Sequence, residues 1–372
     1  MIKIAYDPLI FSSQIYGGIS RYFCEIASRI SNSQVSRVNV NVVAPMYKNQ
    51  YLDKLPKYLV RGFKSPFSFN LMSLYQRAFS FILGDLILRY LSPDIIHETY
   101  YFRWPLGSKK AIRVLTIYDM IHEKFKSQFS ISDKTSEYKA LAADRADHII
   151  CISESTKKDV IQILGIKSEK ISVIHLGFDL MMYSKNVSSI PDVLLTKPYL
   201  LYVGLRGGYK NFDMLVRTYA SSSILKRKFN LICFGGGKFS SAELALFESL
   251  ELNDEQVLQF SGDDNFLANF YKKALMFVYP SLYEGFGIPP LEAMAYDCPV
   301  ACSNTSSIPE VVGDAGIYFD PTNINDMRNK IETLAGSLTL RNSFIKAGKL
   351  RLRNFSWNKC AVETFKVYKK LV

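Results

Sequence analysis

The sequence predicts an α/β protein made of two doubly wound domains, each built around a parallel sheet. Its 372 residues exceed one ordinary domain and suffice for two domains of about 150–200 residues. Short apolar runs rich in β-branched residues alternate with helical patterns, which is typical of βαβ units. The alternation stops near the middle of the chain and then starts again, so we expect two sheets.

The predicted strands form two series, separated by a polar stretch. The first series is Lys3–Tyr6, Val38–Val43, Asp94–His97, Val114–Ile117, His148–Ile152 and Ile171–His175, and the second is Tyr199–Val203, Asn230–Phe234, Val257–Phe260, Met276–Tyr279 and Val300–Cys302. Leu180–Lys197 lacks periodicity and contains Pro191, which predicts a boundary. We expect domains over residues 1–185 and 195–355, and a C-terminal helix over 356–372 that packs back toward the first domain.

The composition is that of a globular protein, with 48% hydrophobic and 22% charged residues. The net charge is +12, and residues 1–180 hold 24 Lys and Arg against 16 Asp and Glu. A basic protein suits nucleic acid, an anionic membrane surface or phosphorylated substrates. The charge alone does not choose among these partners.

The start of the chain and its cysteines predict the compartment. The first residues form a strand pattern and not a signal peptide, and no run of 18 uncharged apolar residues follows. The six cysteines are scattered, which fits a reducing environment. We therefore expect a cytoplasmic protein without a membrane span.

The most informative segment is Tyr279–Ala295, where a strand ends, a glycine-rich turn follows and two prolines open a helix. The N–H groups of such a turn and of the helix N-terminus can bind a diphosphate. Gly285 and Gly287 allow a ligand to approach the backbone. Glu284 and Glu292 frame the turn, and each carboxylate can accept hydrogen bonds from two sugar hydroxyls. An isolated Glu292 would equally suit the first turn of a helix.

This segment resembles the E-x7-E signature of the retaining GT-B glycosyltransferases of family 4. The resemblance extends along most of the chain and includes Gly17–Tyr22, Ile152–Asp159, Tyr202–Gly204, Lys210–Asn211, Phe234–Gly237 and Ser307–Gly316. It implies two facing Rossmann-like domains with an interdomain cleft. It also implies transfer of a hexose from a nucleoside diphosphate sugar with retention of the anomeric configuration.

The resemblance implies a donor site on the second domain. Glu292 would hold the ribose, and Glu284 would hold the sugar together with the turn that follows it. The backbone of this turn, which also contacts the phosphates, belongs to Gly285, Phe286, Gly287 and Ile288.

A second cluster follows the strand that ends near Gly204. The loop carries Arg206 and Lys210, and two cations at a strand end can offset the charge of a departing diphosphate. The resemblance implies this role for both residues and places Gly204 in the donor site. Without that context, they would be two solvated loop charges.

The first domain offers weaker candidates. Gly17 and Gly18 follow the first strand, and the resemblance places such glycines beneath the phosphates of the nucleotide. A glycine pair on its own more often forms an ordinary turn.

The histidine pattern of the first domain departs from that of the relatives. His97 ends a predicted strand and is the candidate for contact with the donor sugar. Relatives often have a second histidine at the position of Thr99, and another at that of Tyr118. Asp119 is retained and is a candidate catalytic residue, and His122 follows it closely.

Residues 57–90 interleave basic and aromatic side chains. The basic ones are Lys57, Arg61, Lys64, Arg77 and Arg89, with tyrosines and phenylalanines between and beside them. Such a segment fits peripheral contact with an anionic membrane surface, here the inner face of the cytoplasmic membrane. It fits equally a helix of the domain with a solvated face. No nucleic-acid-binding motif accompanies it, so we expect no nucleic-acid partner.

Together these patterns predict a hexosyltransferase of polysaccharide or glycolipid synthesis. GDP-mannose is the favoured donor and a UDP-sugar the next, and the expected acceptor is a saccharide, lipid-linked in view of the net charge and the basic and aromatic segment. The chain contains no Asp-x-Asp, so we expect no divalent metal and no cofactor. The alternatives are a nucleotide-sugar 2-epimerase of GT-B architecture and a non-catalytic subunit that binds sugar nucleotides.

Overall fold

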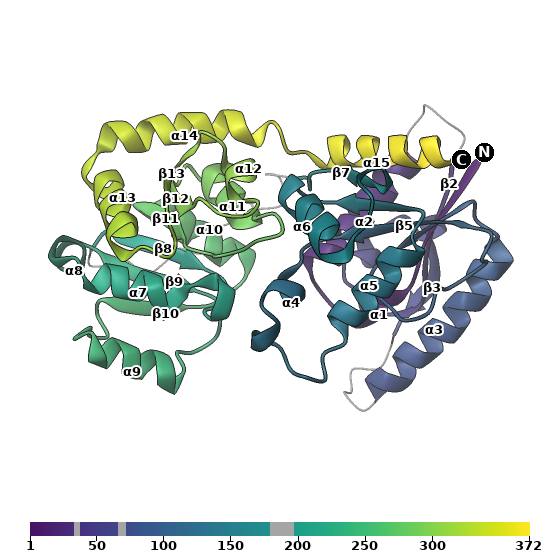
Figure 1. Ribbon diagram of the computed structural model, residues 1–372, viewed down its shortest axis with the longest axis horizontal. Helices are drawn as coiled ribbons and strands as arrows, with labels where there is room; N and C mark the ends of the chain where they lie inside the picture. Colours follow the sequence, from purple (N-terminus) through teal and green to yellow (C-terminus); the bar gives the residue numbers. More distant parts are fainter. Residues whose placement is uncertain (33–37, 66–71, 179–196) are drawn as a thin grey trace. The chain divides into compact units, whose positions relative to one another are not determined.

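A computed structural model describes residues 1–32, 38–65, 72–178 and 197–372, with side chains from residue 78 onward in the helix that begins at Met72. The chain divides into two compact units (Figure 1). Unit 1 comprises Met1–Gly177 and Phe355–Val372, and unit 2 comprises Phe178–Asn354. Of the predicted boundary segment, residues 180–196 lie outside the described residues.

Unit 1 is built on a seven-stranded parallel sheet with the order β3-β2-β1-β4-β5-β6-β7. Its strands are β1 (Ile2–Tyr6), β2 (Val38–Tyr47), β3 (Val60–Lys64), β4 (Ile95–Glu98), β5 (Ile112–Ile117), β6 (His148–Cys151) and β7 (Ile171–Val173). All the predicted strands of the first series are confirmed. The edge strand β3 was not predicted, because most of its residues are exposed and two are charged, so no apolar run marks it.

Helices far apart in the sequence complete unit 1. They are α1 (Leu9–Ser13), α2 (Gly18–Ser31), α3 (Met72–Leu91), α4 (Ile121–Lys124), α5 (Thr135–Arg145), α6 (Glu154–Leu164) and α15 (Trp357–Leu371). The C-terminal helix α15 lies along α2 (Figure 1). There Arg29 Nε donates a hydrogen bond to Asn358 Oδ1 at 2.8 Å.

Unit 2 is built on a six-stranded parallel sheet with the order β10-β9-β8-β11-β12-β13. Its strands are β8 (Tyr199–Val203), β9 (Asn230–Phe234), β10 (Val257–Phe260), β11 (Met276–Tyr279), β12 (Val300–Ser303) and β13 (Gly316–Phe319). The predicted strands of the second series are confirmed. The short β13 was not predicted, because it begins with Gly316, a residue type depleted in strands. A Cβ there would lie 2.9 Å from the carbonyl oxygen of Val300.

Helices pack around the sheet of unit 2. They are α7 (Phe212–Ala220), α8 (Ser223–Lys228), α9 (Ser241–Ser249), α10 (Asp264–Lys273), α11 (Ile288–Ala295), α12 (Ile308–Val312), α13 (Ile324–Gly336) and α14 (Leu338–Leu352). A core of fully buried side chains joins Leu200 and Val278 of the sheet to Leu215 of α7 and Ile331 of α13. The predicted fold class, two α/β units with parallel sheets, is confirmed.

Each sheet has a point where the strand order reverses. In unit 1 it lies between β1 and β4, and in unit 2 between β8 and β11. Doubly wound sheets bind their ligands outside the carboxyl ends of the strands at such points. The residues that directly follow these four strands therefore mark where each unit should bind a ligand.

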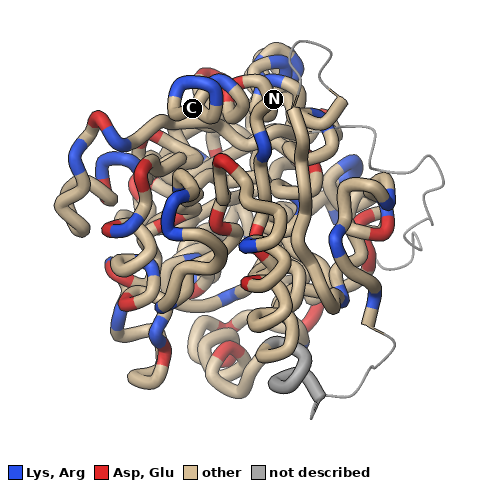
Figure 2. The backbone as a smooth tube through the Cα atoms, turned by 90° about the vertical axis from the view of Figure 1, so that its right-hand side faces the viewer, with Lys and Arg blue, Asp and Glu red and all other residues tan. Residues whose placement is uncertain are grey.

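The hydropathy of the helices and the distribution of charged residues bear on contact with a membrane. Among the residues that the structure describes, no helix is both long enough and apolar enough to cross a membrane. Lys and Arg are interspersed with Asp and Glu along the backbone (Figure 2). Some form surface ion pairs, such as Lys64 with Asp53 and Arg89 with Asp85.

Candidate functional site

The turn that follows β11 is held by two serines of the loop between β12 and α12. Ser307 Oγ donates hydrogen bonds to the carbonyls of Glu284 and Phe286 at 2.9 and 2.8 Å, and the Glu284 N–H donates to Ser306 Oγ at 2.9 Å. Gly287 has a φ of +105°, which disfavours any residue with a Cβ. The protein itself therefore fixes the shape of the turn from which α11 starts.

The loop that follows β8 is tied to this same turn. The Leu282 N–H donates a hydrogen bond to the carbonyl of Tyr209 at 2.8 Å. Asn211 Nδ2 donates to the carbonyls of Pro280 and Pro321 at 3.0 and 2.8 Å. Because β8 and β11 are neighbours in the sheet, these contacts bring the two predicted clusters of unit 2 together.

Lys210 and Glu284 form an ion pair at the strand ends. Lys210 Nζ lies 2.7 Å from Glu284 Oε1, and the two side chains are 20% and 10% exposed. Lys210 Nζ also lies 5.2 Å from the ring centre of Tyr209 and 5.9 Å from that of Tyr279. Partial burial strengthens such a pair relative to a surface pair. A cation and an acceptor side by side suit a ligand that carries both phosphate and hydroxyl groups.

Arg206 is held by other groups of unit 2 in this structure. Its side chain is 3% exposed and pairs with Glu243 through Nε at 2.6 Å. Its Nη atoms donate to the carbonyls of Gly235 and Gly237 at 2.8 and 3.0 Å. Burial would raise the pKa of Glu243, but the hydrogen bonds from Arg206 and Ser240 outweigh it and the net shift is downward. In this structure Arg206 positions the glycine loop that follows β9, and its contact with a diphosphate stays a prediction.

The remaining donor-site candidates of unit 2 surround the turn. Glu292 lies in the second turn of α11 and accepts a hydrogen bond from the Tyr271 hydroxyl at 3.1 Å. Gly204 has a φ of +127°, and a Cβ there would meet nothing within 4 Å. Gly285 is buried and Ile288 is half-buried at the start of α11. Their contacts with a donor stay predictions.

In unit 1, Gly17 and Gly18 lie where α2 begins. Gly17 is the N-cap residue, and it provides no side-chain cap. A Cβ on Gly18 would meet nothing within 4 Å, whereas one on Gly17 would lie 2.5 Å from Gln14 Oε1. The start of α2 is therefore sterically open at Gly18. That these glycines lie beneath phosphates stays a prediction.

His97 packs within unit 1 in this structure, and its contact with the donor sugar stays a prediction. Its ring is fully buried. Its Nδ1 is 2.5 Å from the Tyr368 hydroxyl, and its Nε2 is 2.8 Å from Thr116 Oγ1. Burial lowers the pKa of His97 to about 3, so the ring is neutral at physiological pH. Phe23 packs edge-on against it at 5.0 Å between ring centres.

Asp119 belongs to a charged cluster with a fully buried lysine. Lys139 Nζ donates to the Asp119 carbonyl and to Glu123 Oε2, both at 2.8 Å, and lies 3.7 Å from Asp119 Oδ1. The Asp119 side chain is 29% exposed, so it keeps access to solvent. His122 stacks on Phe129 at 4.0 Å between ring centres. A catalytic role for Asp119 stays a prediction.

The structure thus brings Lys210, Glu284 and their turn together, and it separates Arg206 and His97 from open surface. Ser306 and Ser307 were missed as supports of the turn, although Ser307 opens a segment on which the resemblance rests. Within the described ranges, no group of three or more His, Cys, Asp or Glu side chains is arranged to hold a metal ion.

Two family models match the chain in succession. "Glycosyltransferase Family 4" matches residues 16–181, and "Glycosyl transferases group 1" matches residues 188–351. Together they cover most of unit 1 and nearly all of unit 2. The chain belongs to the family 4 glycosyltransferases of the GT-B fold.

Individual relatives agree with this family. The chain is 30% identical over 237 residues to the O-antigen chain mannosyltransferase B of Escherichia coli, covering 61% of this chain and 62% of that protein. It is 28% identical over 272 residues to the serotype-specific mannosyltransferase WbdA of the same species, covering 67% of this chain and 33% of that longer protein. The chain therefore spans less than two thirds of either mannosyltransferase.

Solved structures share the fold across the whole chain. Sucrose-phosphate synthase of Thermosynechococcus elongatus has a TM-score of 0.73 at 18% identity, covering 100% of this chain and 99% of that one. Anabaena Alr3699/HepE, in complex with UDP and glucose, has a TM-score of 0.69 at 17% identity and covers 100% of both chains. At these identities the likeness concerns the fold alone.

Proposed function

We propose that the protein is a retaining glycosyltransferase that moves a hexose from a nucleoside diphosphate sugar to a saccharide acceptor, without a divalent metal. GDP-mannose is the favoured donor and a UDP-sugar the next. The acceptor is lipid-linked, and the product serves polysaccharide or glycolipid synthesis at the inner face of the cytoplasmic membrane.

The observation that carries this proposal is the Lys210–Glu284 pair at the switch point of unit 2. The lysine provides positive charge for a diphosphate, and the carboxylate provides acceptors for sugar hydroxyls. The start of α11 adds backbone N–H groups that favour an anion. These groups supply the charge that a metal ion provides in other transferases.

The reaction needs little from the protein beyond positioning. The bond between the anomeric carbon and the diphosphate oxygen breaks, and a bond from the acceptor hydroxyl oxygen to that carbon forms on the same face. The acceptor proton passes to the departing diphosphate. Lys210 stabilises the charge that develops on this leaving group, and Glu284 holds the hexose in place.

The relatives support the donor and the acceptor. Two of them are mannosyltransferases by name, one of the O-antigen chain. A further relative from Campylobacter jejuni, 28% identical over 230 residues, is named as an N-acetylgalactosaminyltransferase whose acceptor carries diphospho-undecaprenol. These names favour GDP-mannose and a lipid-linked saccharide for this chain.

A thermal-shift screen tests the donor. We expect GDP, and more weakly UDP, to raise the melting temperature, whereas ADP and dTDP leave it unchanged. The Glu284→Gln variant should lose the extra shift that the complete sugar nucleotide gives over its nucleoside diphosphate. Glu248→Gln, at an exposed position of α9, is the matched control. No shift with any of the four nucleotides would contradict the proposal.

Incubation with the donor, followed by NMR, separates the remaining alternatives. Transfer to an added acceptor in the presence of a chelator, with unchanged anomeric configuration, is the expected result. Conversion of the donor to its 2-epimer without any acceptor would indicate an epimerase. Donor binding without transfer to any acceptor would indicate a non-catalytic subunit.

A further inference from the structure

Unit 1 has an apolar groove of about 590 Å³ at its own switch point, a volume within the range of about 300–1,000 Å³ for ligand pockets. Its lining includes Pro8 and Leu9 after β1, Phe81 and Ile82 of α3, and Phe102 and Trp104 of the loop after β4. β1 and β4 are the neighbours between which the strand order reverses. The groove therefore lies where a doubly wound domain binds its ligand.

The chemistry of this lining favours a hydrocarbon over a saccharide. Among the residues whose side chains the structure describes, those that line the groove provide serine and tyrosine hydroxyls and one indole N–H, but no charged, amide or imidazole side chain. Sugar sites need several such groups, because every hydroxyl that loses water must find a partner. A hydrocarbon chain makes no such demand and gains free energy from each apolar contact.

The apolar surface continues out of the groove along α3. Phe79, Ile82, Leu86 and Tyr90 are 46%, 63%, 56% and 88% exposed, and their spacing places them on one face of the helix. Ile82 belongs both to this face and to the groove. A chain longer than the groove would thus find apolar surface beyond its mouth.

A cation lies beside Trp104, which lines the groove. The exposed Arg103 guanidinium lies 5.3 Å from the ring centre of Trp104, which is itself 57% exposed. An arginine beside an exposed tryptophan suits a ligand with an anionic group next to a hydrocarbon chain. The phosphate of a lipid phosphate has this arrangement.

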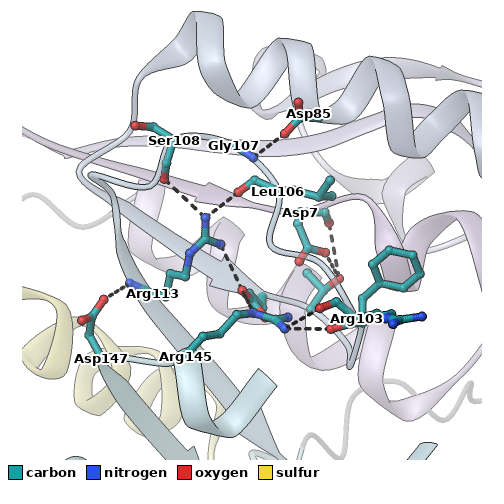
Figure 3. Close-up of polar contacts among 12 residues, drawn as sticks. Asp7, Asp85, Arg103, Leu106, Gly107, Ser108, Arg113, Arg145 and Asp147 are labelled. Atoms are coloured by element: carbon teal, nitrogen blue, oxygen red, sulfur yellow. Dashed lines mark hydrogen bonds and ion pairs between the residues drawn. The ribbon is translucent and has the colours of Figure 1, made fainter. Parts of the chain in front are cut away.

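A buried arginine, Arg113, and a half-buried one, Arg145, hold the loop that forms one wall. Arg113 donates to the Leu106 carbonyl at 2.8 Å, and Arg145 donates to the Phe102 carbonyl at 2.8 Å. Both also pair with Glu98 at 3.0 Å. Figure 3 shows how the two guanidinium groups converge on the loop from neighbouring elements. The groove wall is therefore held in place by the protein, which lowers the cost of binding.

We propose that this groove binds the hydrocarbon chain of a lipid-phosphate-linked acceptor, with Arg103 beside the phosphate. The proposal rests on the proposed function, because it assigns a place to the lipid part of the acceptor. On this proposal the protein recognises the acceptor by its lipid as well as by its sugar. The same saccharide on a long chain should therefore be a better acceptor than on a short one.

Binding can be measured without turnover by tryptophan fluorescence. Trp104 is exposed in the groove, whereas Trp357, the second tryptophan of the chain, is 3% exposed. Farnesyl diphosphate added to the whole protein below its micelle concentration should shift the tryptophan emission to the blue at micromolar concentration. Inorganic diphosphate should not. Trp104→Phe should abolish the signal, and Ile82→Asp should weaken binding about tenfold.

Leu350→Asp is the matched control, because Leu350 of α14 is 61% exposed and Ile82 is 63% exposed. It should leave binding of farnesyl diphosphate unchanged. Ile82→Asp should also lower the ratio of kcat/KM for a long-chain acceptor to that for a short-chain acceptor about tenfold, with the KM for the donor unchanged. Circular dichroism of each variant confirms that it folds.

Other results would overturn the groove assignment. They are no shift with farnesyl diphosphate, an equal shift with inorganic diphosphate, or a shift that occurs with anionic vesicles and not with the monomeric chain. A dimer that Ile82→Asp converts to a monomer would show that a second copy covers this surface. Binding of the chain without transfer of sugar would contradict the proposed function and leave the groove in place.

Discussion

The two units have the same kind of parallel sheet, yet their strand ends differ in chemistry. At the switch point of unit 2, Lys210 and Glu284 are charged and partly exposed. At that of unit 1, the surface is an apolar groove, and the polar side chains of His97 in β4 and of Asp7 directly after β1 are buried. His97 is fully buried, and Asp7 is 1% exposed.

This contrast agrees with the proposed function, in which one architecture accommodates two kinds of ligand. The sheet and the switch point determine where a ligand binds, and the loops after the strands determine which ligand it is. Charged groups in unit 2 suit a sugar nucleotide, and apolar side chains in unit 1 suit a lipid. The contrast predicts that changes in unit 2 affect donor use, whereas changes in unit 1 affect acceptor use or stability.

The largest expected effect comes from Glu284→Gln in unit 2. The change removes the charge that faces Lys210 and one strong acceptor for a sugar hydroxyl. We expect kcat/KM to fall about 100- to 1,000-fold, the usual loss when one preorganised polar contact of a reaction is removed. Steady-state assays with the donor, beside Glu248→Gln, measure the loss. Activity within threefold of the unchanged protein would show that Glu284 has no part in the reaction.

Arg206→Met and Lys210→Met together test whether Arg206 and Lys210 of unit 2 have separate roles. Removing the guanidinium leaves Glu243 and several carbonyls of the glycine loop without their partner. We therefore expect the free energy of unfolding to fall by about 3 kcal/mol. Lys210→Met, at a more exposed position, should weaken nucleoside diphosphate binding and change stability little. Urea denaturation and calorimetric titration measure the two effects. An unchanged free energy of unfolding in Arg206→Met would contradict the positioning role.

Asp7→Asn tests the buried polar layer of unit 1. Burial raises the pKa of Asp7 to about 7, with a further upward contribution from the nearby Glu98 that hydrogen bonds from Thr99 and Leu9 oppose. A raised folded-state pKa means that stability is full below about pH 4 and falls as the pH rises toward and through 7. From pH 5 to pH 8 the free energy of unfolding of the unchanged protein should fall by about 2.5 kcal/mol.

The Asp7→Asn variant should be insensitive to this part of the pH range. Denaturation curves at pH 5, 6.5 and 8 measure the difference between the two proteins. A parallel pH dependence in both would show that another group is responsible.

The sequence predicted β8 to β12 of unit 2 closely, because buried strands are continuous apolar runs, and it missed β13. The ends of β8, β9, β10 and β11 agree residue for residue with the prediction. The exposed β3 carries no such pattern and was missed. The turn at Glu284 followed from its glycines and prolines and from the family resemblance, because it depends on local chain geometry. Its ion pair with Lys210 joins residues 74 apart in the sequence and was not predicted.

The direction of long polar side chains could not be predicted, because it depends on partners far away in the sequence. Arg206 pairs with Glu243, which lies on α9 beyond an entire strand. His97 lies at a strand end, as predicted, but Tyr368 of the C-terminal helix takes up one of its ring nitrogens. A strand pattern indicates where a residue lies along the sheet. It does not indicate which buried partner will compete with the ligand.

The smallest effect on activity is expected from His97→Gln, and it separates packing from catalysis in unit 1. Glutamine keeps one donor and one acceptor for Tyr368 and Thr116 but loses the ring that packs against Phe23. We expect a loss of about 1–2 kcal/mol in the free energy of unfolding. The pH profile of kcat/KM should stay unchanged between pH 5.5 and 8, because the ring of His97 is neutral throughout this range. If the pH profile of the unchanged protein has a titration step that the variant lacks, His97 reaches the reacting sugar. Unit 1 would then contribute a polar group to the reaction in spite of its apolar groove.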